Sequence, residues 1–158
     1  MSESGERRAV KGDGYAVADL SDLGEGYGFR KIRKELGVNA FGVNAIVLPP
    51  LYATGGHYHD EQEELYFLHE GRVAIEFGDG SSQELEAGGL ARVDAATIRG
   101  LRNLSDTEDA VYIVVGGKDG YIGRDGRLPE GENIEQIAND HALSKGEDRG
   151  SGDASSGA

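Results

Sequence analysis

Short apolar runs alternate with glycine-rich turns through the middle of the chain, residues 15–128. Short runs of apolar or alternating apolar and polar residues cover 43–48, 64–69, 72–77, 83–86, 90–93 and 110–115, and a weaker one covers 100–103. Strand-like runs that recur about every 8–12 residues and are separated by turn residues are typical of a β-sandwich or a β-barrel. The pattern therefore predicts an all-β domain in which the stronger runs belong to one closed or nearly closed sheet system.

A segment ahead of these strands fits two structures. Residues 29–36 are compatible with a helix or with a strand, and Gly28 and Gly37 bound them. The segment holds a dense basic cluster, Arg30, Lys31, Arg33 and Lys34. We expect a solvated face that pairs with the acidic residues of the chain, and the alternative is a site for an anion.

The two ends of the chain differ from the middle in composition. Residues 1–14 are charged and nearly free of apolar side chains, and residues 129–158 are acidic and finish in a low-complexity run. We expect a flexible segment over 1–14 and a largely disordered tail over 129–158, because neither buries enough apolar surface to offset chain entropy. Within the tail, residues 133–143 fit a short helix, with a frayed surface segment as the alternative.

Composition and charge narrow the class of protein. The chain has 158 residues, which suits one domain, and its 29 acidic against 16 basic residues give a formal charge of −13. An acidic chain argues against nucleic acid as a partner, because phosphate binding needs a basic surface. No apolar stretch approaches the roughly 20 residues of a membrane helix, so we expect no membrane partner. The start lacks a secretory signal, which favours a cytoplasmic location, and the absence of cysteine excludes disulfides and thiol chemistry.

The residues that carry chemistry lie close together in the sequence. His57 and His59 are two of only four histidines, and their spacing on a strand points both imidazoles to the same face. Glu64 follows at the start of the next predicted strand, where pairing of the two strands would bring it to the imidazoles. Two histidines and one carboxylate on a face make up the facial triad of non-haem iron sites. The two interpretations are a site for a divalent transition metal and a metal-free pocket.

Neighbouring residues have simpler interpretations. Tyr66 shares the strand parity of Glu64, so it should face the interior and either bond a ligand or pack in the core, of which packing is the commoner. His69 and Glu63 have the opposite parity and should face outward. Asn103 is expected to be structural, because its amide can tie a strand end or a turn.

The spacing around the histidines resembles that of the cupin superfamily. The first cupin motif is Gly-x5-His-x-His-x3/4-Glu-x6-Gly. The chain matches its last four named positions with His57, His59, Glu64 and Gly71, but has Leu51 in place of the first glycine. The second motif is Gly-x5-Pro-x-Gly-x2-His-x3-Asn, and the chain has in turn Gly88, Asp94, Ala96, Arg99 and Asn103. The resemblance covers residues 39–117. Through the run at 116–121 the chain also resembles a group of small, single-domain bacterial cupins (type-2 conserved barrel) of uncharacterised function.

The resemblance implies a cupin double-stranded β-helix, a jelly-roll barrel with inward-facing ligands, and another jelly roll or a sandwich is the alternative fold. It also implies a homodimer formed through a barrel sheet. The usual metal set of three histidines and one glutamate would place iron, manganese, zinc or nickel on His57, His59 and Glu64. Arg99 stands at the fourth position, and a guanidinium cannot coordinate a cation. Arg99 would therefore pair with Glu64, swing outward and leave three metal ligands, or receive the carboxylate or phosphate of a small ligand.

Two functions are compatible with these residues. The first is a small-molecule-binding barrel, with Arg99 and Tyr66 as ligand-binding residues and with or without a metal on the triad; Arg99 favours it. The second is a metal-dependent enzyme, an oxygenase or an isomerase or lyase; the intact triad favours it. Cupin barrels host enzymes, sensors and storage proteins alike, so the fold does not decide between the two.

Overall fold

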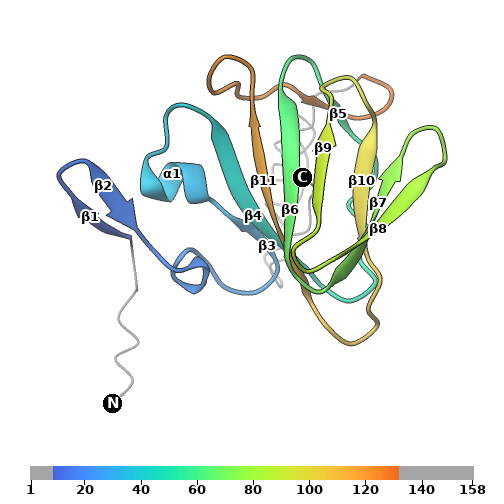
Figure 1. Ribbon diagram of the computed structural model, residues 1–158, viewed down its shortest axis with the longest axis horizontal. Coiled ribbons are helices and arrows are strands. Elements are labelled where there is room, and N and C mark those ends of the chain that lie inside the picture. Colours follow the sequence, from blue (N-terminus) through green and yellow to red (C-terminus); the bar gives the residue numbers. More distant parts are fainter. Residues whose placement is uncertain (1–8, 132–158) are drawn as a thin grey trace, which may run out of the picture.

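The structure of the protein is a computed structural model that describes residues 9–131 (Figure 1). Along the chain these residues form β1 (Val10–Gly12), β2 (Tyr15–Val17), the 3-10 helix η1 (Leu20–Asp22), β3 (Gly28–Arg30), α1 (Ile32–Leu36), β4 (Gly42–Leu48), β5 (Tyr58–His59), β6 (Glu63–Glu70), β7 (Arg72–Phe77), β8 (Ser82–Glu86), β9 (Leu90–Val93), β10 (Arg99–Asn103), β11 (Ala110–Gly117) and β12 (Gly126–Arg127).

Two antiparallel sheets carry the fold. The larger has the strand order β3-β4-β11-β6-β9, and the smaller has the order β10-β7-β8. Isolated bridges from Ala53 to Arg102 and from His57 to Arg99 tie the segment before β5 to the free edge of β10. Strand β12 pairs with β5, so the end of the described chain returns to the histidine segment.

Side-chain alternation along the strands explains why the sheets pack face to face. On β11, Ala110, Tyr112 and Val114 are buried while the residues between them are only half-buried. On β6 the buried positions are Glu64, Tyr66 and Leu68. Since side chains at i and i+2 share a face of a strand, the same pattern that builds the apolar core sends the Glu64 carboxylate into the interior.

The strands predicted from the sequence are confirmed. Strands β4, β6, β7, β8, β9, β10 and β11 cover the predicted runs with ends shifted by at most two residues, and residues 40–117 contain no helix. The ambiguous segment 29–36 is divided: its start belongs to β3 and its remainder forms α1. Gly37 adopts φ 72°, a left-handed conformation that glycine accepts at little cost, and it ends the helix.

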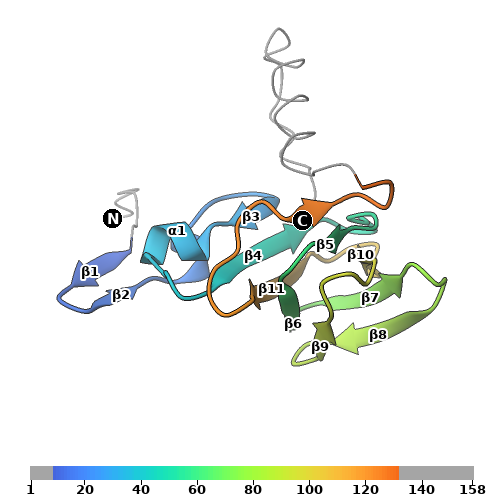
Figure 2. The same ribbon diagram turned by 90° about the horizontal axis from the view of Figure 1, so that it is seen from above.

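Strands shorter than four residues were missed, because they carry no periodic pattern. The largest difference is at the N-terminal side, where β1 and β2 pair as a hairpin within a region whose first 14 residues were expected to be flexible. The hairpin projects away from the barrel, at the end opposite β7 and β8 (Figure 2), and Tyr15 at its tip is 61% exposed. The predicted helix in the acidic tail lies outside the described residues. No helix among the described residues is long and apolar enough to span a membrane.

Candidate ligand pocket and metal centre

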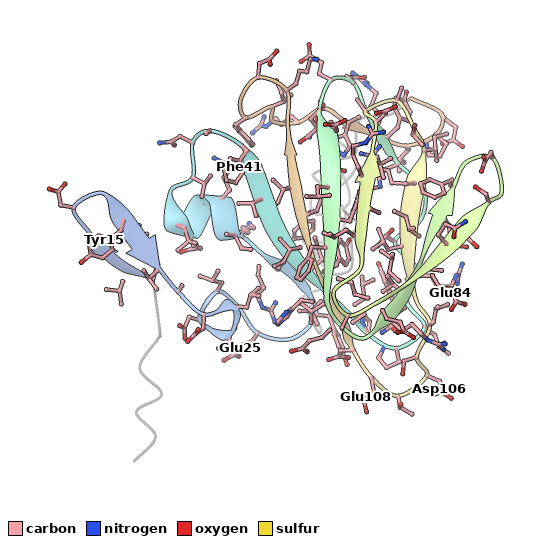
Figure 3. All side chains as sticks on the ribbon, in the orientation of Figure 1. Tyr15, Glu25, Phe41, Glu84, Asp106 and Glu108 are labelled. Atoms are coloured by element: carbon pink, nitrogen blue, oxygen red, sulfur yellow. The ribbon has the colours of Figure 1, made fainter. Side chains whose placement is uncertain are left out.

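A cavity of about 600 Å³ opens at the end of the barrel that contains the C-terminal end of β11. Strands β4, β6 and β11 supply its walls, and residues 121–126, which run over this end of the barrel toward β12, supply its cover (Figure 1). The opposite end of the barrel carries acidic side chains, including Asp106 and Glu108 (Figure 3). The volume is in the range of pockets that hold small organic molecules.

Three of the predicted site residues meet at the floor of this cavity. His57 precedes β5, His59 ends it, and Glu64 is the second residue of β6. One ligand atom from each of the three lies within 4.8 Å of the other two. The imidazole rings stand edge to face, with centroids 5.2 Å apart, and all three residues are buried. Strand parity and spacing therefore brought the correct side chains together.

Arg99 lies directly opposite His57, because the backbones of the two residues exchange hydrogen bonds of 2.9 Å in both directions. Its side chain points into the protein and is 0% exposed. The Nη2 group donates to Glu64 Oε1 at 2.8 Å, and Nε donates to the Tyr66 hydroxyl at 3.2 Å. Of the three orientations left open by the sequence, the structure has the inward one, with Arg99 paired to Glu64.

The remaining guanidinium nitrogen fixes Arg99 in place. Nη1 donates to three backbone carbonyl oxygens of the β9–β10 loop, at 2.7 to 3.2 Å: those of Asp94, Ala95 and Thr97. Arg99 does not line the cavity; it lies behind Glu64 and Tyr66. As the structure places it, Arg99 therefore reaches the cavity only through these two side chains.

Tyr66 packs in the core, the commoner of the two roles considered from the sequence, and its hydroxyl bonds neighbouring side chains. Its ring belongs to the apolar core and lies 5.9 Å from the ring of Tyr112. Its hydroxyl donates to Glu64 Oε1 at 2.8 Å and accepts from Arg99. Burial raises the pKa of the Tyr66 phenol well above its usual value, so the hydroxyl keeps its proton.

His59 lies between two carboxylates. Its Nδ1 is 2.9 Å from Asp125 Oδ1, and its Nε2 is 3.0 Å from Glu64 Oε1, although the second contact lacks hydrogen-bond geometry. A neutral imidazole can donate to only one of these acceptors. Burial alone would lower the pKa of His59, but Glu64 and Asp125 outweigh burial and raise the pKa above its usual value. The protonated imidazole of His59 is thus favoured between the carboxylates of Asp125 and Glu64.

The pKa values of the other two triad residues both lie below their usual values, which leaves His57 neutral and Glu64 ionised. Burial lowers the pKa of His57, whose Nε2 lies 3.8 Å from Glu64 Oε1. Burial would raise the pKa of Glu64, but its contacts with His57, His59 and Arg99 outweigh burial and hold the pKa far below the usual range. The floor therefore carries the ionised Glu64 carboxylate, whose negative charge is balanced by the neighbouring Arg99 and His59.

Asp125 is a site residue that sequence analysis missed. It lies 66 residues from His59 in the sequence and just before the two-residue strand β12. Its carboxylate accepts from the backbone amides of Glu61 and Gln62, at 3.1 and 3.0 Å, and from the Gln62 side chain. The only available signal was its place shortly after the glycine-rich run at 116–121, which says nothing about a partner. Asp125 fixes the orientation of His59 and joins the cavity cover to the histidine segment.

A glycine on β11 makes room for this contact network. A Cβ added at Gly116 would collide with Gln62 Oε1 and approach Glu64 Cγ to 3.3 Å. Gly116 lies in the run of the sequence that resembles small bacterial cupins. Its missing side chain lets Gln62 lie against His59 and Asp125.

The donor set at the floor fits a metal ion with three protein ligands. The Nδ1 atom of His57 is buried and has no hydrogen-bond partner among the described residues, and His59 Nε2 faces the Glu64 carboxylate. Neutral imidazole and carboxylate are suitable ligands for iron, manganese, zinc or nickel. Arg99 opposes the binding of such an ion, because its guanidinium is positively charged and already bonds Glu64 Oε1. The residues fit a metal ion in type and spacing, and we expect the charge of Arg99 to lower their affinity for it.

The basic cluster is solvated at Lys31 and Lys34, as expected, but within residues 9–131 it lacks the acidic partners that the sequence led us to expect. Lys31, Arg33 and Lys34 line the mouth of the cavity. Arg30 turns away from them: it is 8% exposed and donates to the carbonyl oxygen of Gly26 at 2.7 Å. The short length of α1 explains the difference, because a helix of one turn beside β4 presents most of its cations to a single opening.

Residues expected to be structural or external behave as predicted. His69 and Glu63 are exposed, and Glu63 bonds Arg92 at 2.8 Å on the outer surface. The Asn103 amide donates to the carbonyl oxygens of Leu48, Pro49 and Glu108 and ties the two ends of the β10–β11 loop. His141 lies outside the described residues.

Two antiparallel sheets wrapped around a cavity with inward-facing histidine and glutamate side chains define a double-stranded β-helix protein. The family model for the cupin domain matches residues 45–116, which include the triad and Arg99. Residues 45–116 therefore match the cupin domain, and the fold of the described chain is the cupin double-stranded β-helix.

Solved structures show the same fold at low sequence identity. A cupin protein from Bacteroides fragilis is 23% identical over 68% of this chain and 86% of its own, with a TM-score of 0.55. A conserved protein with a double-stranded β-helix domain from Klebsiella pneumoniae is 20% identical over 58% and 76%, with a TM-score of 0.51. A structure from the DMSP lyases RdDddP and RnDddQII is 19% identical over 71% and 59%, with a TM-score of 0.52. No curated protein matches the chain in sequence.

Proposed function

We propose that the protein is a small-molecule-binding cupin in which an arginine–glutamate pair, and not a fourth metal ligand, completes the pocket floor. The observation that carries the proposal is the burial of Arg99 with its Nη2 group 2.8 Å from Glu64 Oε1. In the cupin motif this position holds a metal-binding histidine. Here the same position supplies a fixed positive charge.

The charge balance of the floor supports a binding role. Glu64 Oε1 accepts hydrogen bonds from Tyr66 and Arg99, and Asp125 bonds the Nδ1 atom of His59. A buried charge is tolerated when it is paired and hydrogen-bonded, so this network is stable without a further ion. Above it, the cavity retains space for a small molecule, and Tyr66, His57 and His59 present polar edges to that space.

The test is the affinity for metal ions of the wild-type protein and of Arg99→His. The substitution removes the positive charge and offers an imidazole at the fourth position, so we expect zinc or manganese to bind about tenfold or more tightly than to the wild type. Arg102→His is the matched control, because it adds an imidazole on the same strand but outside the barrel, where Arg102 is 48% exposed. Calorimetric titration of the three proteins, prepared without a histidine tag, measures the difference.

The two possible failures differ in meaning. If Arg99→His gains no affinity over Arg102→His, Arg99 does not control the site and the proposal is wrong. If the wild type already binds metal as tightly as the variant, the site is a working three-ligand metal centre.

A metal-dependent enzyme is the second candidate, and a specific observation favours it. The buried His57 Nδ1 lacks a partner among the described residues, and the three donor atoms lie within 4.8 Å. A bound divalent metal would supply a Lewis acid with open positions for a substrate. The chain's own residues would then hold the ligands in place: Asp125 fixes His59, and the Tyr66 hydroxyl donates to Glu64. A homodimer through a barrel sheet and a cytoplasmic location stay predictions.

A further inference from the structure

The mouth of the cavity concentrates positive charge in a strongly acidic chain. Lys31, Arg33 and Lys34 line the opening, although acidic residues outnumber basic ones 29 to 16. The acidic residue of the same helix, Glu35, does not line the cavity, and the two carboxylates that do are already engaged with basic partners at the floor.

These cations lack the partners that arginines elsewhere in the fold possess. Carboxylates within 4.0 Å are present at five arginines, namely Arg72, Arg92, Arg99, Arg102 and Arg127. Among residues 9–131, Lys31, Arg33 and Lys34 form no such ion pair. Lys11 and Lys118 also form no ion pair with the described residues, but only the cluster at 31–34 places its unpaired cations on the lining of the cavity, where an anion could meet them.

Arg33 helps to build the mouth. Its guanidinium carbon lies 4.0 Å from the centroid of the Tyr121 ring, in a cation–π contact. Tyr121 belongs to the cavity cover, so this contact joins α1 to the cover, while Lys31 and Lys34 stay exposed beside it.

The interior beyond the mouth is mixed in character. Phe29, Val43, Val114 and Ile122 give it apolar walls, while the histidines, Glu64 and Tyr66 form its polar floor. A molecule with a short apolar body and a charged end can contact the apolar walls with its body and the lysines at the mouth with its charge.

We propose that the pocket accepts a small organic anion, with an apolar body inside the cavity and its carboxylate or phosphate group at the mouth between Lys31 and Lys34. The proposal rests on the small-molecule-binding function and specifies its ligand class. The lysines select for charge, because each contributes a screened attraction at an exposed position.

The experiment compares acids with their uncharged isosteres. Hexanoate and hexanamide, and 3-phenylpropionate and 3-phenylpropanamide, are titrated into protein with labelled methyl groups, and hexyl phosphate distinguishes a preference for phosphate from one for carboxylate. The methyl resonances of Val43, Val114 and Ile122 report both affinity and location. We expect each acid to bind about fivefold or more tightly than its amide, with shifts at these methyl groups, and the difference to shrink as salt is added.

A double substitution assigns the effect to the mouth. Lys31→Gln with Lys34→Gln should abolish the preference for the acid while leaving amide binding unchanged. Lys11→Gln with Lys118→Gln removes the same charge from residues that do not line the cavity, and should preserve the preference.

Each negative result has its own meaning. Equal affinity for acid and amide, with shifts at the cavity methyl groups, overturns the anion proposal and leaves the small-molecule function standing. Equal loss of preference in both double variants also overturns it, because net charge and not the mouth would then be responsible. No shift at these methyl groups with any probe up to about 10 mM contradicts both the anion proposal and the small-molecule function.

Discussion

Positive charge is used differently at the floor and at the mouth of the same cavity. At the floor, Arg99 is fully buried, and hydrogen bonds to Glu64, Tyr66 and backbone carbonyls hold it in a single position. At the mouth, Lys31 and Lys34 are exposed and have no carboxylate partner among the described residues. A charge that is removed from water must be neutralised by other groups of the protein. An exposed charge is solvated by water and is therefore free to bind a ligand. We therefore infer that the floor contributes to the stability of the fold, and we propose that the mouth selects the ligand.

The largest expected effect comes from breaking the buried pair. Arg99→Met leaves the Glu64 carboxylate buried without its cation, so we expect a loss of about 3–5 kcal/mol in the free energy of unfolding. Arg102→Met breaks the exposed pair with Glu76 on the same strand, at 3.1 Å, and should cost about 1 kcal/mol or less. Urea denaturation measures both values. Similar losses in the two variants would show that the floor is not organised by Arg99.

The cover of the cavity provides the next effect. Asp125→Asn removes the charge that holds His59 and the amides of Glu61 and Gln62, so we expect a loss of about 1–3 kcal/mol in the free energy of unfolding. The pKa of His59 should also fall, because the carboxylate that favours the imidazolium is gone. A histidine titration by NMR and a urea titration measure the two effects.

A matched substitution separates the role of Asp125 from a general loosening of the cover. Asp60 forms an exposed ion pair with Arg127 of β12, at 2.7 Å. Asp60→Asn should cost less stability and leave the pKa of His59 unchanged. A fall of the His59 pKa in Asp60→Asn as well would contradict direct orientation by Asp125.

Acid should weaken the floor in a way that depends on Glu64. The folded state holds the Glu64 pKa far below its ordinary value of about 4.5, so its stabilising contribution is complete above that value and declines as the pH falls below it. Between about pH 5 and pH 3, the free energy of unfolding of the wild type should fall more steeply than that of Glu64→Gln, by about 1 kcal/mol per pH unit. The control is Glu63→Gln, an exposed neighbour, which should keep the wild-type slope. Equal slopes in all three proteins would mean that Glu64 is not ionised in a buried pair.

The smallest expected effect is at the mouth. Lys31→Gln with Lys34→Gln should change the free energy of unfolding by less than about 0.5 kcal/mol, because exposed side chains without ion pairs contribute little to stability. Thermal and urea denaturation check this value. A loss comparable to that of Arg99→Met would show that the lysines support the fold and would remove the distinction between floor and mouth.

The floor was predictable from the sequence because strand periodicity acts over short distances. His57, His59, Glu64 and Tyr66 fall on predicted strands or beside them, so parity alone places their side chains inside. The position of Arg99 required the resemblance to the second cupin motif, and its inward orientation depends on the carbonyl groups of the β9–β10 loop, which no periodic pattern encodes.

The mouth and the cover could not be predicted in the same way. Asp125 meets His59 through β5 and β12, each of two residues, which are too short to show alternation. Lys34 belongs to a one-turn helix and Lys31 directly precedes it, and the direction of this helix depends on how it packs beside β4. Both features depend on tertiary contacts between segments far apart in the chain, which is where single-sequence reasoning loses its physical basis.

The most direct test of the account is the metal content of the wild-type protein. Elemental analysis of protein purified without a histidine tag, from medium supplemented with iron, manganese, zinc and nickel, measures ions per chain. The account predicts far less than one transition metal per chain, because Arg99 already neutralises Glu64 at the position a metal would need. One tightly held metal ion per chain would contradict it and would identify His57, His59 and Glu64 as a working metal centre.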